Sequence, residues 1–236
     1  MQEANADRER LVLLEWKCFN LLDDKICAKT LFHKISSEPE FFVHLIISLY
    51  RKSNSDACDE DIAEEDITNE ERAAFCKQSW SVLRAWNVIP GMQQDGTFDQ
   101  KKMISWIDAV SKLATEREVL EAAMLHLGQV SFYAPTNEDG FFIHEVVAKM
   151  LNAEDAEKQR NGYSMEVLNS RGAHFIDGTG EEEFELEQKW NKRADAAEER
   201  GFFLFAQTLR EIAKDFHMEG RQNIASAIKT NLLSDS

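Results

Sequence analysis

Apolar residues recur at three- and four-residue steps along almost the whole chain. The first stripe is made of Leu11, Leu14, Cys18, Leu21 and Leu22. Side chains at this spacing share one face of an α-helix, and that face is normally buried. Only 3 prolines and 10 glycines occur among 236 residues, so the chain has few of the turns that a β fold requires. The sequence therefore predicts an all-α protein.

The stripes group into about ten helices joined by short turns, which favours antiparallel packing of consecutive helices. We predict a single all-α unit over residues 1–236. A degenerate helical-repeat array is an open alternative, because loose arrays keep the stripe and lose the residue signature. Near the end, Gly201 is expected to separate two helices, and another helix is expected over Gly220–Leu233.

Several helices carry a recognisable start. Thr68 and Glu71 form the two ends of a capping box, and Thr97–Gln100 can cap the helix after it. Between Phe41 and Tyr50 almost every side chain is apolar. Such a helix should lie at the centre of the core or cover a partner surface.

The chain is strongly acidic. Its formal net charge is −16, from 27 basic and 43 acidic residues. A phosphate backbone or an anionic membrane would be repelled, so we expect no direct nucleic-acid and no membrane contact. Nine acidic residues without a base fall between Asp56 and Glu71. Residues 53–67 are therefore expected to form an acidic flexible loop, and a docking strip for a basic partner is the alternative.

The sequence also indicates a compartment. Its first residues, MQEANADRER, are polar and do not resemble a signal peptide. The longest apolar run is far shorter than the ~20 residues of a spanning helix. The 4 cysteines lack metal-binding spacing and fit reduced thiols. We expect a cytoplasmic protein.

No residue pattern in the chain fixes a reaction. The phosphate-binding loop, the dinucleotide fingerprint, the zinc-protease helix and the hydrolase elbow are all absent, and no two histidines lie four residues apart on one helix. We predict no catalytic residue, no metal ligand and no cofactor.

The candidate site is a glycine-rich irregular stretch, residues 161–183, which holds four of the ten glycines. Arg171 beside Gly172 could hold an acidic group, and glycine lets a backbone come close. The predicted ligand or partner contacts are His126, Gln129, Asp139, Asn169, Arg171, Gly172 and His174. In the alternative, Arg171 pairs with one of the chain's own carboxylates and Asn169 caps a helix end. Gly128, inside a helix, suggests close packing of another backbone.

Six short segments along the chain belong together: LEWKCFNLL, EPEFFVHLIISLYR, WNVIPGMQQDGTFD, HLGQVSFYAPTNEDG, VLNSRGAHF and FAQTLREIAKDF. They resemble the C-terminal helical region of large, mostly uncharacterised bacterial proteins, some of which look like multidomain defence NTPases. The resemblance implies a non-catalytic module that senses a ligand or contacts a partner chain. Our first interpretation is a helical recognition or assembly module of a bacterial, anti-phage type of complex, with a larger subunit or a second copy as partner. The alternative is a ligand-binding or enzymatic helical domain with a pocket around Asn169–His174.

Overall fold

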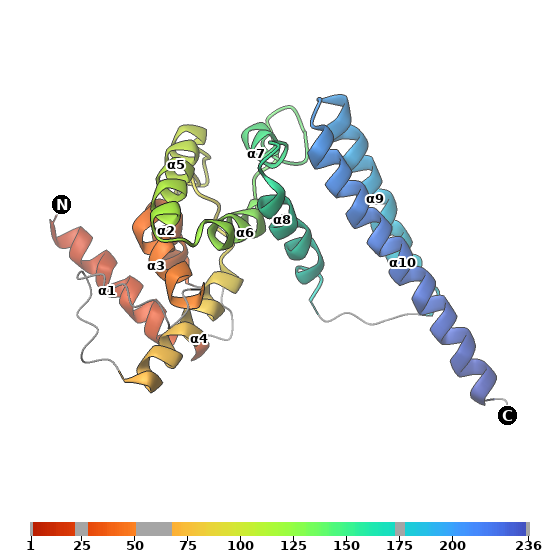
Figure 1. Ribbon diagram of the computed structural model, residues 1–236, viewed down its shortest axis with the longest axis horizontal. Coiled ribbons are helices and arrows are strands. Elements are labelled where there is room, and N and C mark those ends of the chain that lie inside the picture. Colours follow the sequence, from red (N-terminus) through yellow and green to blue (C-terminus); the bar gives the residue numbers. More distant parts are fainter. Residues whose placement is uncertain (1, 22–27, 51–67, 173–177, 235–236) are drawn as a thin grey trace. The chain divides into compact units, whose positions relative to one another are not determined.

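The computed structural model describes residues 2–21, 28–50, 68–172 and 178–234. Within these ranges the chain forms helices and no strand, so the all-α prediction is confirmed (Figure 1). The elements are α1 (Gln2–Cys18), η1 (Phe19–Leu21), α2 (Lys29–Ser37), α3 (Pro39–Tyr50), α4 (Asn69–Ala85), α5 (Gln100–Glu116), α6 (Leu120–Ser131), α7 (Glu145–Leu151), α8 (Glu157–Asn169), α9 (Glu181–Glu199) and α10 (Phe203–Ser234). The expected acidic loop, 53–67, lies outside the described residues.

The chain divides into two compact units, Met1–His126 and Leu127–Ser236. The sequence predicted one unit over the whole chain. Apolar stripes show which face of each helix is buried, but they do not show which stripes pack against each other. The division falls inside α6, where no break in the sequence marks it.

In the first unit, α3 lies in the core, as its apolar sequence predicted. Phe42, Leu45 and Ile46 are fully buried. The ring of Phe42 lies 5.4 Å from that of Trp86 and 5.0 Å from that of Trp106. The helix packs against both α4 and α5. This aromatic cluster joins α3 to the residue that ends α4, Trp86, and to α5, which contains Trp106.

The face of α1 that is buried differs from the prediction. Leu11 and Leu14, which belong to the predicted stripe, are 44% and 58% exposed, whereas Val12 and Phe19 are buried. The reason is Glu15, whose carboxylate accepts a hydrogen bond of 2.6 Å from the backbone N–H of Leu31. No side chain within α2 caps its first turn, so the Glu15 carboxylate pairs with a backbone N–H there. The face of α1 that carries Glu15 therefore lies against α2.

The helix caps agree with the sequence in one case and differ in another. Thr68 and Glu71 form the predicted capping box at α4. At α5 the cap is Asp99, whose carboxylate accepts from the backbone N–H groups of Lys101 and Lys102. Thr97 is not the cap, because its hydroxyl donates to a neighbouring aspartate in the turn.

In the second unit, α9 and α10 run side by side as an antiparallel pair (Figure 1). Gly201 separates them as predicted, but α10 continues to Ser234 without a break at Gly220. A Cβ atom on Gly180 would lie 2.7 Å from the carbonyl oxygen of Gly220. Gly220 thus serves the close approach of the two chain segments and does not end a helix.

A second close approach joins α6 to α8. A Cβ atom on Gly128 would lie 2.0 Å from the carbonyl oxygen of Gln159, which is too short for any contact. The expectation that another backbone packs against this helical glycine is confirmed.

None of the helices in the described ranges is long and apolar enough to cross a membrane.

Candidate binding site

Arg171, the centre of the predicted site, ties the end of α8 to α9 and α10. Its Nη1 atom lies 2.8 Å from the Oε2 atom of Glu219. Its Nη2 atom lies 2.9 Å from the Oε1 atom of Glu183 and 3.5 Å from the Oε1 atom of Glu182. The guanidinium also lies over the ring of Phe216, 5.3 Å from its centroid. The side chain is 11% exposed, so it is surrounded by the chain itself.

Both members of the Arg171–Glu183 pair carry charge. Burial alone would raise the pKa of the Glu183 carboxyl group, but the hydrogen bond and positive charge of Arg171 hold it below its ordinary value. Burial alone would likewise lower the pKa of Arg171, but the surrounding glutamates raise it. This is the arrangement of the alternative interpretation, in which Arg171 pairs with carboxylates of its own chain.

The other predicted residues near Arg171 complete the end of α8. Asn169 is the last residue of the helix, and its carbonyl accepts a hydrogen bond of 3.1 Å from the N–H of Gly172. Gly172 has a positive φ of 61°. His174 lies outside the described residues. The irregular part of the stretch 161–183 is shorter than predicted, because its first nine residues belong to α8 and its last three to α9.

Asp139 has a local partner of a different kind. Its Oδ2 atom lies 2.8 Å from the Nη1 atom of Arg200 at the end of α9, and its Oδ1 atom accepts from Asn137 and Phe141. These hydrogen bonds, that from Asn137 first, lower the pKa of the Asp139 carboxyl group. The Arg200 guanidinium lies over the ring of Phe141, 4.3 Å from its centroid. Asp139 therefore fixes the turn before α7 to the end of α9.

His126 and Gln129 lie on α6, and the unit boundary falls between them. His126 is buried, and its Nε2 atom lies 3.2 Å from the hydroxyl of Tyr50. Gln129 is half-buried, and its carbonyl accepts from the N–H of Phe132 where α6 ends. The described members of the predicted site thus occupy separate local settings, and none of them lines either of the two hollows described next.

The smaller hollow, of about 270 Å³, lies between α9 and α10. It is lined by Glu187, Asn191, Arg210, Lys214 and His217. Three of its five lining residues already pair with one another or with α9: the Nδ1 atom of His217 lies 2.9 Å from Glu187, and Arg210 pairs with carboxylates of α9. Lys214 is the one cation of this hollow for which the described residues show no ion pair, so the hollow gathers less unpaired charge than the larger one.

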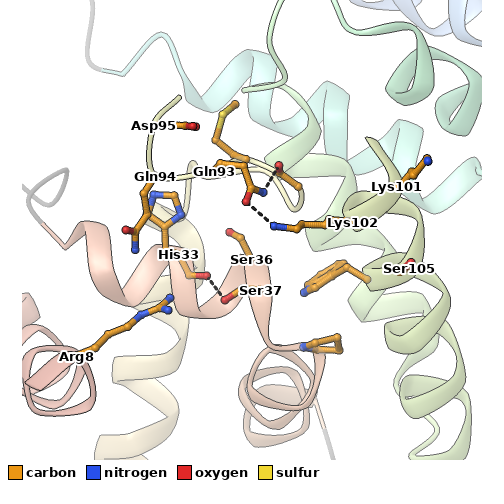
Figure 2. Close-up of a pocket in the computed structure, with 14 residues that line it drawn as sticks. Arg8, His33, Ser36, Ser37, Gln93, Gln94, Asp95, Lys101, Lys102 and Ser105 are labelled. Carbon is orange, nitrogen blue, oxygen red and sulfur yellow. Dashed lines mark hydrogen bonds between the residues drawn. The ribbon is translucent and has the colours of Figure 1, made fainter. Parts of the chain in front are cut away.

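The larger hollow, of about 840 Å³, belongs to the first unit and is lined by α1, α2, the start of α3, the 86–99 segment and α5. We call it the basic hollow. Its lining residues are Arg8, His33, Ser36, Ser37, Pro39, Gly91, Met92, Gln93, Gln94, Asp95, Lys101, Lys102, Ser105 and Trp106. In Figure 2, Arg8 and His33 lie on one side of it, and Lys101 and Lys102 lie on the other. Its volume is in the range of ordinary ligand pockets, roughly 300–1,000 Å³.

The walls of the basic hollow are joined by buried hydrogen bonds. The Ser36 hydroxyl donates to the carbonyl of Val88 and accepts from the Nε1 atom of Trp86 at 2.9 Å. These bonds attach the end of α2 to the 86–99 segment. That segment is in turn attached to the start of α5, because the N–H of Asp99 donates to the carbonyl of Gly91 at 2.9 Å. The lining residues therefore sit on an interlinked frame.

The charge of the basic hollow is opposite to that of the chain. Arg8, Lys101 and Lys102 line it, and Asp95 is the one carboxylate among its lining residues. In the described part of the chain, no carboxylate forms an ion pair with Arg8 or Lys101. The Nζ atom of Lys102 donates to the amide oxygen of Gln93 at 2.6 Å, which does not neutralise it.

His33 adds a group that is neutral at physiological pH. Burial first, and then the positive charge of Arg8, lower the pKa of the His33 imidazole below its ordinary value. The imidazole therefore lies close enough to the Arg8 guanidinium to feel its positive charge. A bound anion would reverse this effect and favour the protonated imidazole.

Trp106 contributes a donor that has no acceptor. The side chain is 4% exposed, and its Nε1 atom is buried without a hydrogen-bond partner among the described residues. Trp86 in the same cluster differs, because its Nε1 atom donates to Ser36. Leaving a buried donor unpaired costs about 1–3 kcal/mol. Because Trp106 lines the basic hollow, a ligand acceptor that reached this donor would be stabilised.

Sequence reasoning missed the basic hollow because its cations come from distant segments. Arg8 and Lys101 are far apart in the sequence, and no run of Lys or Arg residues indicates that they form a cluster. The described residues contain no group of three or more side chains that could hold a metal ion.

Neither a family model, nor a curated protein, nor a solved structure matches the chain. The function is therefore argued from the geometry of the site.

Proposed function

We propose that this chain is a non-catalytic recognition module that binds an acidic protein partner at the basic hollow. The observation that supports this most is the reversal of charge. A chain of net charge −16 gathers three cationic side chains and one carboxylate around the basic hollow. Cavities with low-dielectric walls focus the field of the groups that line them, which attracts groups of opposite charge.

The alternative site around Asn169–His174 has less support. The guanidinium of Arg171 already contacts the carboxylates of Glu183 and Glu219. A ligand acid would have to displace them, and the buried Glu183 would then lose its partner. The resemblance to bacterial defence proteins adds the expectation that the acidic partner is another chain of one cytoplasmic complex.

The proposal is tested by titrating the ¹⁵N-labelled protein with two anionic probes, poly-L-glutamate and inorganic pyrophosphate, at low salt. We expect shifts in the backbone amides of 33–37 and 91–102, and weaker shifts as salt is added. Lys101→Gln should weaken binding. Lys112→Gln, an exposed lysine elsewhere on α5, is the matched control and should not. If neither probe moves these resonances, the proposal is wrong.

A further inference from the structure

The cations of the basic hollow are spread over two walls. Arg8 comes from α1, and Lys101 and Lys102 come from the first turn of α5. Figure 2 shows them on opposite sides of the hollow, with Ser36 and Ser37 between them. One compact anion could contact one wall and leave the other unpaired. A ligand with at least two separated acidic groups matches both.

The chemistry of the walls disfavours phosphate groups. Phosphates usually bind free backbone N–H groups at a helix start. At α5 these groups are taken, because the carboxylate of Asp99 accepts from the N–H groups of Lys101 and Lys102 at 3.0 and 3.2 Å. A nucleotide would also need an open aromatic face on which to stack its base. The indole of Trp106 is 4% exposed and offers no such face, which leaves only the smaller, half-buried ring of His33.

A peptide fits the remaining groups. Gln94 carries an exposed amide and Ser105 an exposed hydroxyl, and each of these groups can both donate and accept. The backbone of an extended peptide presents alternating donors and acceptors that such groups can pair with. Acidic side chains on the same peptide would reach the cations on the two walls. The indole N–H of Trp106 needs one acceptor, which a carboxylate or a peptide carbonyl supplies.

We infer that the basic hollow binds a peptide segment bearing two or more carboxylates, and that the N–H of Trp106 donates a hydrogen bond to that segment. The inference rests on the proposed function and specifies the ligand of the same site. Lys101 and Arg8 would hold carboxylates on opposite walls, and Trp106 would select for an acceptor between them. Trp106 acts here as a specificity-determining residue.

Four probes separate this inference from its alternatives. The first is a blocked peptide of alternating Glu and Ala, six residues long, and the second is the same peptide with Gln in place of Glu. The third and fourth are inorganic pyrophosphate and ADP. Binding is followed by calorimetry and by ¹H–¹⁵N spectra of the full chain. We expect the Glu peptide to bind and the Gln peptide not to bind.

Variants locate the binding. Lys101→Gln and Arg8→Gln should each weaken the Glu peptide about two- to five-fold, the range expected for one exposed ion pair. Lys112→Gln should leave the affinity unchanged. The Gln peptide controls for contacts that do not need charge.

The indole N–H resonances test the role of Trp106 without a mutation that could unfold the protein. Trp190 is the internal control, because its Nε1 atom is also buried without a partner but it lines neither hollow. On adding the Glu peptide, the Trp106 resonance should move downfield, as a new hydrogen bond requires, and the Trp190 resonance should stay in place. An unmoved Trp106 resonance during saturable binding would overturn its assignment as the donor.

The outcomes separate the peptide inference from the proposed recognition function. If poly-L-glutamate moves the resonances of the hollow and the Glu peptide does not, the peptide inference fails and the recognition function stands. If only pyrophosphate or ADP moves them, the hollow is an anion or nucleotide site and both proposals fail. If no probe moves them, both fail. If the Glu and Gln peptides bind equally, charge does not drive recognition, and the inference fails.

Discussion

Replacing Arg171 by methionine tests the interaction that holds the end of α8 to the α9–α10 pair. Methionine keeps an unbranched apolar side chain, which can pack on Phe216, and removes the charge. The Glu183 side chain, 4% exposed, would then keep a negative charge without its partner. Removing one partner of a buried ion pair costs about 3–5 kcal/mol. Glu219 and Glu182 are 34% and 55% exposed, so losing them adds little. We expect a loss of about 3 kcal/mol in the free energy of unfolding.

The assay is urea denaturation followed by far-UV circular dichroism. Arg210→Met is the matched control, because Arg210 also joins α10 to carboxylates of α9 but is 43% exposed. Its loss should cost much less, because exposed ion pairs contribute little to stability. Adding Glu183→Gln to Arg171→Met should recover part of the stability, since a neutral amide is cheaper to bury than a carboxylate. If Arg171→Met costs no more than Arg210→Met, the carboxylate of Glu183 is solvated or finds another donor, and the reasoning fails.

The dependence on pH gives an independent check of the same pair. The pKa of Glu183 is held below its ordinary value of 4.5, so its pairing stabilises the folded state above that value. The stabilisation is lost as the pH falls through the lowered pKa. The difference between the wild type and Arg171→Met should therefore be full at neutral pH and shrink below about pH 4. Binding of the Glu peptide to the basic hollow should be unchanged in Arg171→Met, because Arg171 does not line that hollow.

Three further changes test the packing by the same denaturation assay. Ile46→Ala should cost about 2–5 kcal/mol, because Ile46 is fully buried in α3 and its truncation leaves a cavity; a neutral result would place α3 at the surface. Gly128→Ala should cost at least about 1–3 kcal/mol, since its Cβ atom would overlap the carbonyl of Gln159; a smaller cost would show that α6 and α8 can separate. Trp106→Phe should cost about 1–2 kcal/mol less than Trp86→Phe, because only the indole N–H of Trp86 has an acceptor to lose. Equal costs would indicate that Trp106 has a partner, such as a bound water.

The helical content and many helix ends could be predicted from the sequence, because they depend on local features. The spacing of apolar residues sets the helical period, and the capping box at Thr68 fixes the start of α4. Gly201 ends α9 with a positive φ of 80°, as a glycine after a helix often does. Gly220 is also a glycine but has another role, because it allows the backbone of Gly180 to come close to α10. The sequence around a glycine does not distinguish a helix end from a close approach.

The partners of the predicted site residues could not be identified from the sequence, because they are distant along the chain. Arg171 is a polar group in a glycine-rich stretch, which by local criteria favours a ligand contact. Its partners Glu183 and Glu219 come from two other helices. The basic hollow was missed for the same reason, since Arg8 and Lys101 become neighbours of one cavity only through the packing of α1, α2 and α5.

Polar side chains that point inward explain two differences from the sequence analysis. One is the buried face of α1, and the other is the pairing of Arg171 with its own chain. The carboxylate of Glu15 is turned inward and accepts from the backbone of α2, and the guanidinium of Arg171 is turned inward and meets Glu183. In each case a polar group lies inside because another group from a distant segment pairs with it, as buried polar groups require. The N–H of Trp106 is turned inward as well, and no group of the described chain pairs with it. Because Trp106 also lines a hollow with unpaired cations on its walls, the partner that this donor lacks is expected to come from another molecule.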